Sequence, residues 1–172
     1  MRKLFLVLTT WALLGPSSGF SEDVKQTDVY RRLKKAIDSV RAIHTLDHLR
    51  PFDQIAERNV TDQGRGMSLE SLWRGSYYGW TNPLSPWMDG ESFESWWSRA
   101  KTDFDDARVT SFYRYLLPAF RDLYGVDFET MTDAQASQLN KQMFENYKSD
   151  IWLNQVITER ADIEVMFFLS TE

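Results

Sequence analysis

The segment IEVMFFL at residues 163–169 decides the fold class that the sequence predicts. Every residue in it except Glu164 is apolar. A nearly continuous apolar run of this length is typical of a strand that is buried on both faces of a parallel sheet. A second strand is predicted around Ile43 and Thr45, before the turn signal at Pro51. Because the sequence between the two strands favours helices, we expect the strands to pair in parallel through a long helical crossover.

Apolar residues recur every three or four positions in several segments, which is the spacing of amphipathic helices. The clearest start signal is Thr132 followed by Gln135, a capping box. Pro118 is expected to kink or split one helix, and Gly125 is expected to end it. The expected helices cover residues 23–40, a short segment from residue 68, and residues 92–104, 109–124 and 132–160. The rest of residues 52–90 is rich in glycine and proline and is predicted to be irregular. The sequence therefore predicts a mainly α chain with two parallel-type strands.

The first 21 residues have the layout of a secretory signal peptide. Arg2 and Lys3 precede an apolar run at residues 4–14, and small residues follow it up to a predicted cleavage after Ser21. The run is shorter than the roughly 20 residues that a membrane span needs. An uncleaved anchor is the alternative interpretation. We therefore expect an exported protein, periplasmic or extracellular, with no membrane span after cleavage.

The composition limits the classes of partner. The formal net charge is −5, and removal of Arg2 and Lys3 with the signal peptide would make the chain more acidic. Because an acidic chain is repelled by phosphate groups, we expect neither nucleic acid nor anionic membrane as a partner. The aromatic content of 15% argues against disorder. The expected organisation is a signal peptide at 1–21, an N-terminal helix at 22–41 and one domain at 42–172.

The only two histidines, His44 and His48, lie together in the segment IHTLDHL at residues 43–49. This segment resembles the phrase Asp-Thr-His-x-His-Leu of the amidohydrolase superfamily, in which the His-x-His pair of the first barrel strand binds a catalytic divalent metal. The chain is also similar to the amidohydrolase-related, uronate-isomerase-like branch, in which a long aromatic-rich helical insertion follows that strand, as residues 49–161 do here. The resemblance implies the incomplete N-terminal part of a TIM-barrel (β/α)₈ metal-dependent hydrolase, with strand 1, the insertion and strand 2 in residues 42–172.

The resemblance places only half of the metal-binding pair in this chain. When the segments are aligned, the second metal histidine of the family falls on His48 and the first falls on Leu46. At about 3.3 Å per strand residue, His44 and His48 would lie roughly 13 Å apart, too far to share one ion without a sharp bend. No histidine follows His48. In full-length relatives we expect a divalent metal, zinc above all, whereas this chain is expected to hold none stably.

Other residues are candidates for contact with a substrate. In the resembled family, the insertion lies over the mouth of the active site, which makes Tyr77, Tyr78 and Trp80 candidate substrate contacts. Arg50 could bind a substrate carboxylate through its forked guanidinium, although a surface salt bridge is an equal alternative. Tryptophans could stack on sugar rings or pack in the core. The helical spacing of Trp96 favours the core, as does that of Trp152.

Two functional hypotheses follow, and the sequence leaves open whether the chain is an enzyme. In the first, it is an N-terminal fragment or degenerate copy of an exported metal-dependent hydrolase or isomerase, inactive alone, whose relatives act on a small polar, carboxylate or carbohydrate substrate. The metal would polarise a carbonyl or activate water. In the second, it is a stand-alone exported module, helical and rich in aromatic residues, that binds carbohydrate or protein.

Overall fold

The computed structural model describes residues 23–47, 50–61 and 63–168. The chain forms two compact units, which divide between Arg41 and Ala42. The predicted signal peptide and His48 lie outside the described residues, as does Leu169, the last residue of the strand predicted at residues 163–169. Within the described ranges, no helix is both long enough and apolar enough to cross a membrane.

The first unit contains a short 3₁₀ helix, η1 (Val24–Gln26), and the helix α1 (Asp28–Asp38). Thr27 begins α1, because its side-chain oxygen accepts a hydrogen bond of 3.1 Å from the backbone N–H of Tyr30. The helix is shorter at both ends than the predicted range of 23–40.

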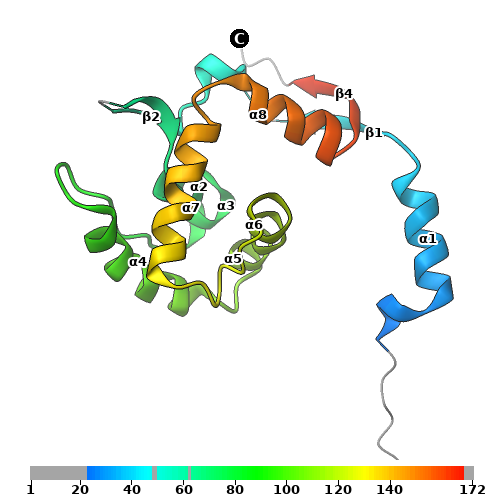
Figure 1. Ribbon diagram of the computed structural model, residues 1–172, viewed down its shortest axis with the longest axis horizontal. Coiled ribbons are helices and arrows are strands. Elements are labelled where there is room, and N and C mark those ends of the chain that lie inside the picture. The colour runs from blue at the N-terminus through cyan, green and yellow to red at the C-terminus, as the bar shows by residue number, and fades with distance from the viewer. Residues whose placement is uncertain (1–22, 48–49, 62, 169–172) are drawn as a thin grey trace, which may run out of the picture. The chain divides into compact units, whose positions relative to one another are not determined.

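The second unit is mainly helical, and Figure 1 shows its helices following one another along the chain. They are η2 (Phe52–Gln54), α2 (Leu69–Gly75), α3 (Tyr77–Thr81), α4 (Phe93–Ala107), α5 (Ser111–Arg114), α6 (Leu117–Tyr124), α7 (Asp133–Asn146), α8 (Asp150–Gln155) and the π-helix η3 (Val156–Arg160). The predicted helix at 109–124 is split, with Pro118 in the first turn of α6. Gly125 ends α6 in the left-handed conformation, with φ of 67°.

The core of the second unit is built mainly from aromatic rings around Trp73. This side chain is fully buried, and its ring centroid lies between 5.0 and 5.6 Å from those of five other rings. The five are Tyr78, Phe104, Tyr113, Phe120 and Phe128. Burial raises the pKa of the Tyr113 hydroxyl to about 12, so this side chain is neutral at physiological pH. Trp96 is fully buried, as its spacing predicted.

Helix α7 closes the core from one side, where it packs against α4, α2 and the strand β3 (Gly64–Met67). Thr132 and Gln135 form the predicted capping box at its start. Ala136, Leu139 and Met143 face the core and are buried. The spacing of three and four residues therefore predicted the start of the helix and its buried face, but the single helix predicted over residues 132–160 is divided into α7, α8 and η3.

Two small sheets, each of two strands, lie in the described part of the second unit. Strands β1 (Ala42–Asp47) and β4 (Ile163–Phe168) pair in parallel, with Ile43 opposite Val165. Strands β2 (Arg58–Thr61) and β3 pair antiparallel. The parallel pairing confirms the expectation for the two predicted strands. The hairpin of β2 and β3 lies in a segment that the sequence predicted to be irregular.

The prediction of an incomplete (β/α)₈ barrel is wrong for the structure described. Helices packed around an aromatic core dominate, and β1 has only β4 beside it among the described residues. Strand β4 was expected to be buried on both faces, yet Val165 and Phe167 are 40% and 57% exposed. A pair of strands has too few neighbours to cover both of its faces, which leaves the apolar run of β4 partly exposed.

Acid is expected to weaken the junction of α4 with α7. The carboxylate of Asp133 accepts hydrogen bonds from Lys101 Nζ (2.8 Å) and Trp97 Nε1 (2.9 Å), which lower its pKa below the ordinary 3.8. A depressed carboxyl pKa gives stability that is present above the unfolded-state pKa and is lost as pH falls through the folded-state pKa. In urea unfolding followed between pH 6 and pH 2.5, Asp133→Asn should therefore flatten the loss of stability below about pH 4. Asp89→Asn removes an exposed carboxylate and should keep the wild-type profile. An unchanged profile for Asp133→Asn would contradict the prediction.

Candidate functional site

Four aromatic side chains form an exposed patch on α3 and α5, which we call the aromatic patch. It consists of Tyr77, Trp80, Phe112 and Tyr115, which are 48%, 76%, 38% and 46% exposed. The ring of Tyr77 lies at the centre, with centroids 5.1 Å from Trp80, 5.8 Å from Phe112 and 6.2 Å from Tyr115. The contact with Trp80 is edge-to-face, at 86°. Large rings that remain in contact with one another at the surface mark a candidate binding site.

The local sequence explains why these rings face outwards. Ser76 begins α3, where its hydroxyl accepts a hydrogen bond from the N–H of Tyr78. In the helix that follows, Tyr77 and Trp80 are three residues apart and share one face. Tyr78 points the other way, into the core.

Helix α5 and the residue that follows it complete the patch. Thr110 caps α5 by accepting a hydrogen bond of 3.2 Å from the N–H of Tyr113. This start places Phe112 on the outer side, while Tyr113 is buried against Trp73. Tyr115, the residue that follows α5, is exposed.

Tyr78 has a structural environment that differs from those of Tyr77 and Trp80. It is fully buried, and its hydroxyl reaches the backbone carbonyl oxygens of Pro83 and Asp103 at 3.2 Å each. Burial raises its pKa well above the ordinary value for tyrosine. A side chain in this position cannot meet a ligand at the surface, so only two of the three aromatic residues predicted to contact substrate lie in the patch.

The structure describes only one of the two residues that were candidate metal ligands. His44 lies in β1 and is half-buried, whereas His48 falls outside the described residues. In the described ranges, no group of three or more histidine, aspartate, glutamate or cysteine side chains is placed to hold a metal ion. Arg50, the predicted carboxylate contact, is exposed.

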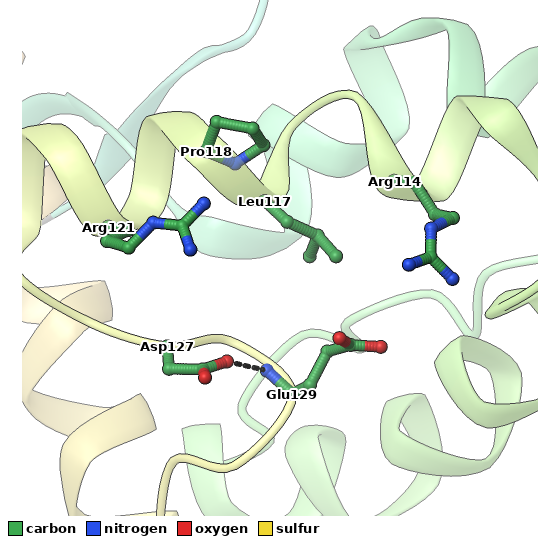
Figure 2. A pocket seen from close by; sticks show the side chains of 6 residues that line it. All are labelled: Arg114, Leu117, Pro118, Arg121, Asp127 and Glu129. Carbon is green, nitrogen blue, oxygen red and sulfur yellow. Dashed lines mark hydrogen bonds between the residues drawn. The ribbon is translucent and has the colours of Figure 1, made fainter. Parts of the chain in front are cut away.

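A cavity of about 250 Å³ opens beside α6, between that helix and the loop that follows it. In Figure 2 the guanidinium groups of Arg114 and Arg121 lie on one side and the carboxylates of Asp127 and Glu129 on the other. Asp127 accepts a hydrogen bond of 3.0 Å from the N–H of Glu129, and Glu129 also pairs with Arg108 at 3.4 Å. Because charges of both signs face this opening, we assign no ligand to it.

Sequence reasoning found half of the aromatic patch. Trp80 and Tyr77 were candidates, but Phe112 and Tyr115 were missed because they sit in a segment predicted only as a helix. Their signal was the pattern Phe-Tyr-Arg-Tyr at residues 112–115, which holds more aromatic side chains than one buried face can take. Trp87, by contrast, lies against the core, where its ring stacks on that of Trp96 with centroids 5.5 Å apart.

No protein-family model, curated protein or solved structure matches this chain.

Proposed function

We propose that this protein is a binding module that recognises carbohydrate through the aromatic patch. The observation that supports the proposal is the exposure of four rings, in which Tyr77 contacts each of the other three. The face of an aromatic ring packs well against the apolar face of a sugar ring. The hydroxyl groups of Tyr77 and Tyr115 add polar tips that can bond to sugar hydroxyls. Trp80, the most exposed ring of the patch, offers the largest stacking surface.

The size of the patch favours a saccharide over a protein partner. Standard protein–protein interfaces use about 20–30 residues on each side. The aromatic patch has four side chains in ring contact, which suits one or a few sugar units.

The hydrolase hypothesis receives less support. It assumed a barrel fold, and the described residues do not form one. Its principal metal ligand, His48, lies outside the described residues. The aromatic patch needs neither feature, since stacking requires only rings held at the surface by a rigid scaffold. Here the scaffold is the aromatic core, which includes Tyr78 of α3 and Tyr113 of α5.

Replacement of Trp80 by alanine should weaken saccharide binding by at least about tenfold, because a large aromatic side chain in a binding site contributes a large share of the free energy of binding. The ligands are neutral β-linked gluco-, xylo- and chito-oligosaccharides, and binding is measured by isothermal titration calorimetry. Trp80→Phe keeps a ring and should retain most of the affinity.

The matched control is Val60→Ala, which removes an apolar side chain that is 81% exposed on β2, outside the aromatic patch. It should bind like the wild type. Wild-type protein that binds none of the three saccharide types, or equal losses in Trp80→Ala and Val60→Ala, would rule out the aromatic patch as a carbohydrate site.

A further inference from the structure

Helix α1 separates apolar and basic side chains onto opposite faces. Val29, Leu33 and Ile37 are four residues apart and therefore lie along one line of the helix. They are 55%, 59% and 70% exposed, and Val40 beyond the helix is 70% exposed. The apolar face is therefore continuous and open to solvent in the described unit.

The opposite face carries an excess of positive charge. Residues 24–38 hold five basic side chains and two acidic ones. The two acidic groups are already paired, Asp28 with Arg31 at 2.5 Å and Asp38 with Lys34 at 2.5 Å. Arg32 and Lys35 make no ion pair with any described residue. Their charges are available to an anionic partner.

A short helix of this kind needs a surface to hold it. Isolated helices of fewer than about 12 residues are marginal in water, because nucleation is costly and few hydrogen bonds repay it. Here 11 residues form the helix. The two exposed ion pairs add little to the stability of the helix, because surface ion pairs contribute little free energy. Burial of the apolar face against a partner would supply the missing stabilisation.

We propose that α1 binds the surface of an anionic phospholipid bilayer. Basic amphipathic helices lie in the plane of the interface, with the apolar face at the boundary of the acyl chains and the basic face among the headgroups. Val29, Leu33 and Ile37 enter the boundary. Arg32 and Lys35 bind headgroup phosphates, and their aliphatic stems extend along the interface. The partner is selected by charge complementarity with the unpaired basic side chains.

The acidic net charge of the whole chain does not oppose this contact. Charges farther away than the Debye length, about 8 Å at physiological ionic strength, are largely screened. A headgroup beside Arg32 is therefore influenced most by charges within that distance, and along residues 24–38 basic side chains outnumber acidic ones. The expectation that anionic membranes are not partners was based on the net charge of the whole chain. That value combines the charges of two units and does not describe α1 by itself.

The test measures the partition of the purified protein, with its N-terminus established by mass spectrometry, onto sedimented vesicles. One set contains equal parts of phosphatidylglycerol and phosphatidylcholine, and the other contains phosphatidylcholine alone. Wild-type protein should bind the anionic vesicles and release them as salt rises. Arg32→Gln with Lys35→Gln should weaken binding about 25-fold, since each basic residue near the surface contributes about fivefold. Leu33→Gln with Ile37→Gln should abolish binding, because it removes apolar side chains that enter the acyl-chain boundary.

The control carries Arg114→Gln and Arg121→Gln, which remove the same charge from exposed positions in the second unit. It should bind anionic vesicles like the wild type. Equal binding to neutral vesicles, an equal loss in the control, or no binding to anionic vesicles at low salt would overturn the proposal. The proposal would also fail if the Leu33 and Ile37 variant converted a dimer to a monomer while vesicle binding was absent throughout, because a second copy would then cover the face.

Discussion

Replacement of Trp73 by alanine should lower the free energy of unfolding by about 3–5 kcal/mol, among the largest effects available to a single core substitution. The side chain is fully buried, and its ring contacts five others, from α3, α4, α5, α6 and the loop after α6. Alanine would leave a cavity at the meeting point of these segments. Their packing is too dense to collapse fully into it.

Trp73 carries a buried hydrogen-bond donor, and a second variant at this position can test what that donor costs. The indole Nε1 of Trp73 is buried and has no hydrogen-bond partner among the described residues. Trp73→Phe would remove this buried donor together with some ring volume. The gain from the lost donor and the cost of the smaller ring oppose each other. Trp73→Phe should therefore cost far less than Trp73→Ala.

Chemical denaturation monitored by far-ultraviolet circular dichroism measures both changes. Trp80→Ala is the matched control, because it removes the same side chain from a site that is 76% exposed, and it should change the free energy of unfolding by less than about 1 kcal/mol. Equal losses for Trp73→Ala and Trp80→Ala would contradict the central role of Trp73 in the core.

The sequence predicted local structure well where one signal determined it. Thr132 and Gln135 set the start of α7, and the apolar spacing that follows set its buried face. Pro118 and Gly125 set the two ends of α6 for steric reasons that depend on the backbone alone. Each of these features acts within a few residues, so no knowledge of distant partners was needed.

The parallel pairing of β1 with β4 was predicted, but other features that depend on distant contacts were not. The segment with Gly64 and Gly66 was predicted to be irregular, yet it forms the strand β3 beside α7. A Cβ atom on Gly66 would lie 2.5 Å from the backbone oxygen of Phe144, so this glycine permits a close approach between strand and helix. A glycine that allows such an approach looks the same in a sequence as one that breaks a strand. The apolar run at residues 163–169 misled for a similar reason, since the sequence did not reveal how few strands would lie beside it.

In the candidate site, too, the sequence left open which residues lie at the surface and which lie in the core. Tyr77 and Tyr78 are adjacent and chemically identical, and both were candidate contacts. The structure places one in the aromatic patch and the other in the core. Which of the two faces outwards depends on where α3 begins, and Ser76 fixes that position. The choice between surface and core therefore rested on a capping hydrogen bond whose position was not recognised in the sequence.

The hairpin of β2 and β3 is fastened to the rest of the second unit by Arg58, whose side chain is only 7% exposed. Its guanidinium and Nε–H donate to the backbone carbonyl oxygens of Phe52, Tyr147, Arg65 and Lys148, at 2.9, 3.0, 3.4 and 3.5 Å. The guanidinium carbon also lies 3.6 Å from the centre of the Phe52 ring. Burial lowers the pKa of Arg58, which shows that the charge bears a desolvation penalty here.

Substitution of Arg58 by methionine should cost about 2–4 kcal/mol, because it leaves buried carbonyl oxygens without donors while keeping most of the side-chain volume. Chemical denaturation measures the total loss. Hydrogen exchange should show faster exchange in β2 and at the end of α7, where the carbonyl oxygens of Tyr147 and Lys148 lose their donor.

Arg65→Met is the control, since Arg65 also donates to backbone carbonyl oxygens, those of Asp53, Ile55 and Arg58, but lies at an exposed position where water can replace it. It should cost less than about 1 kcal/mol. If Arg58→Met cost no more than Arg65→Met, the hairpin would be held to α7 by the close packing of Gly66 against Phe144 instead. Exchange at the end of α7 would then stay slow in both variants, because the contact at Gly66 would be intact.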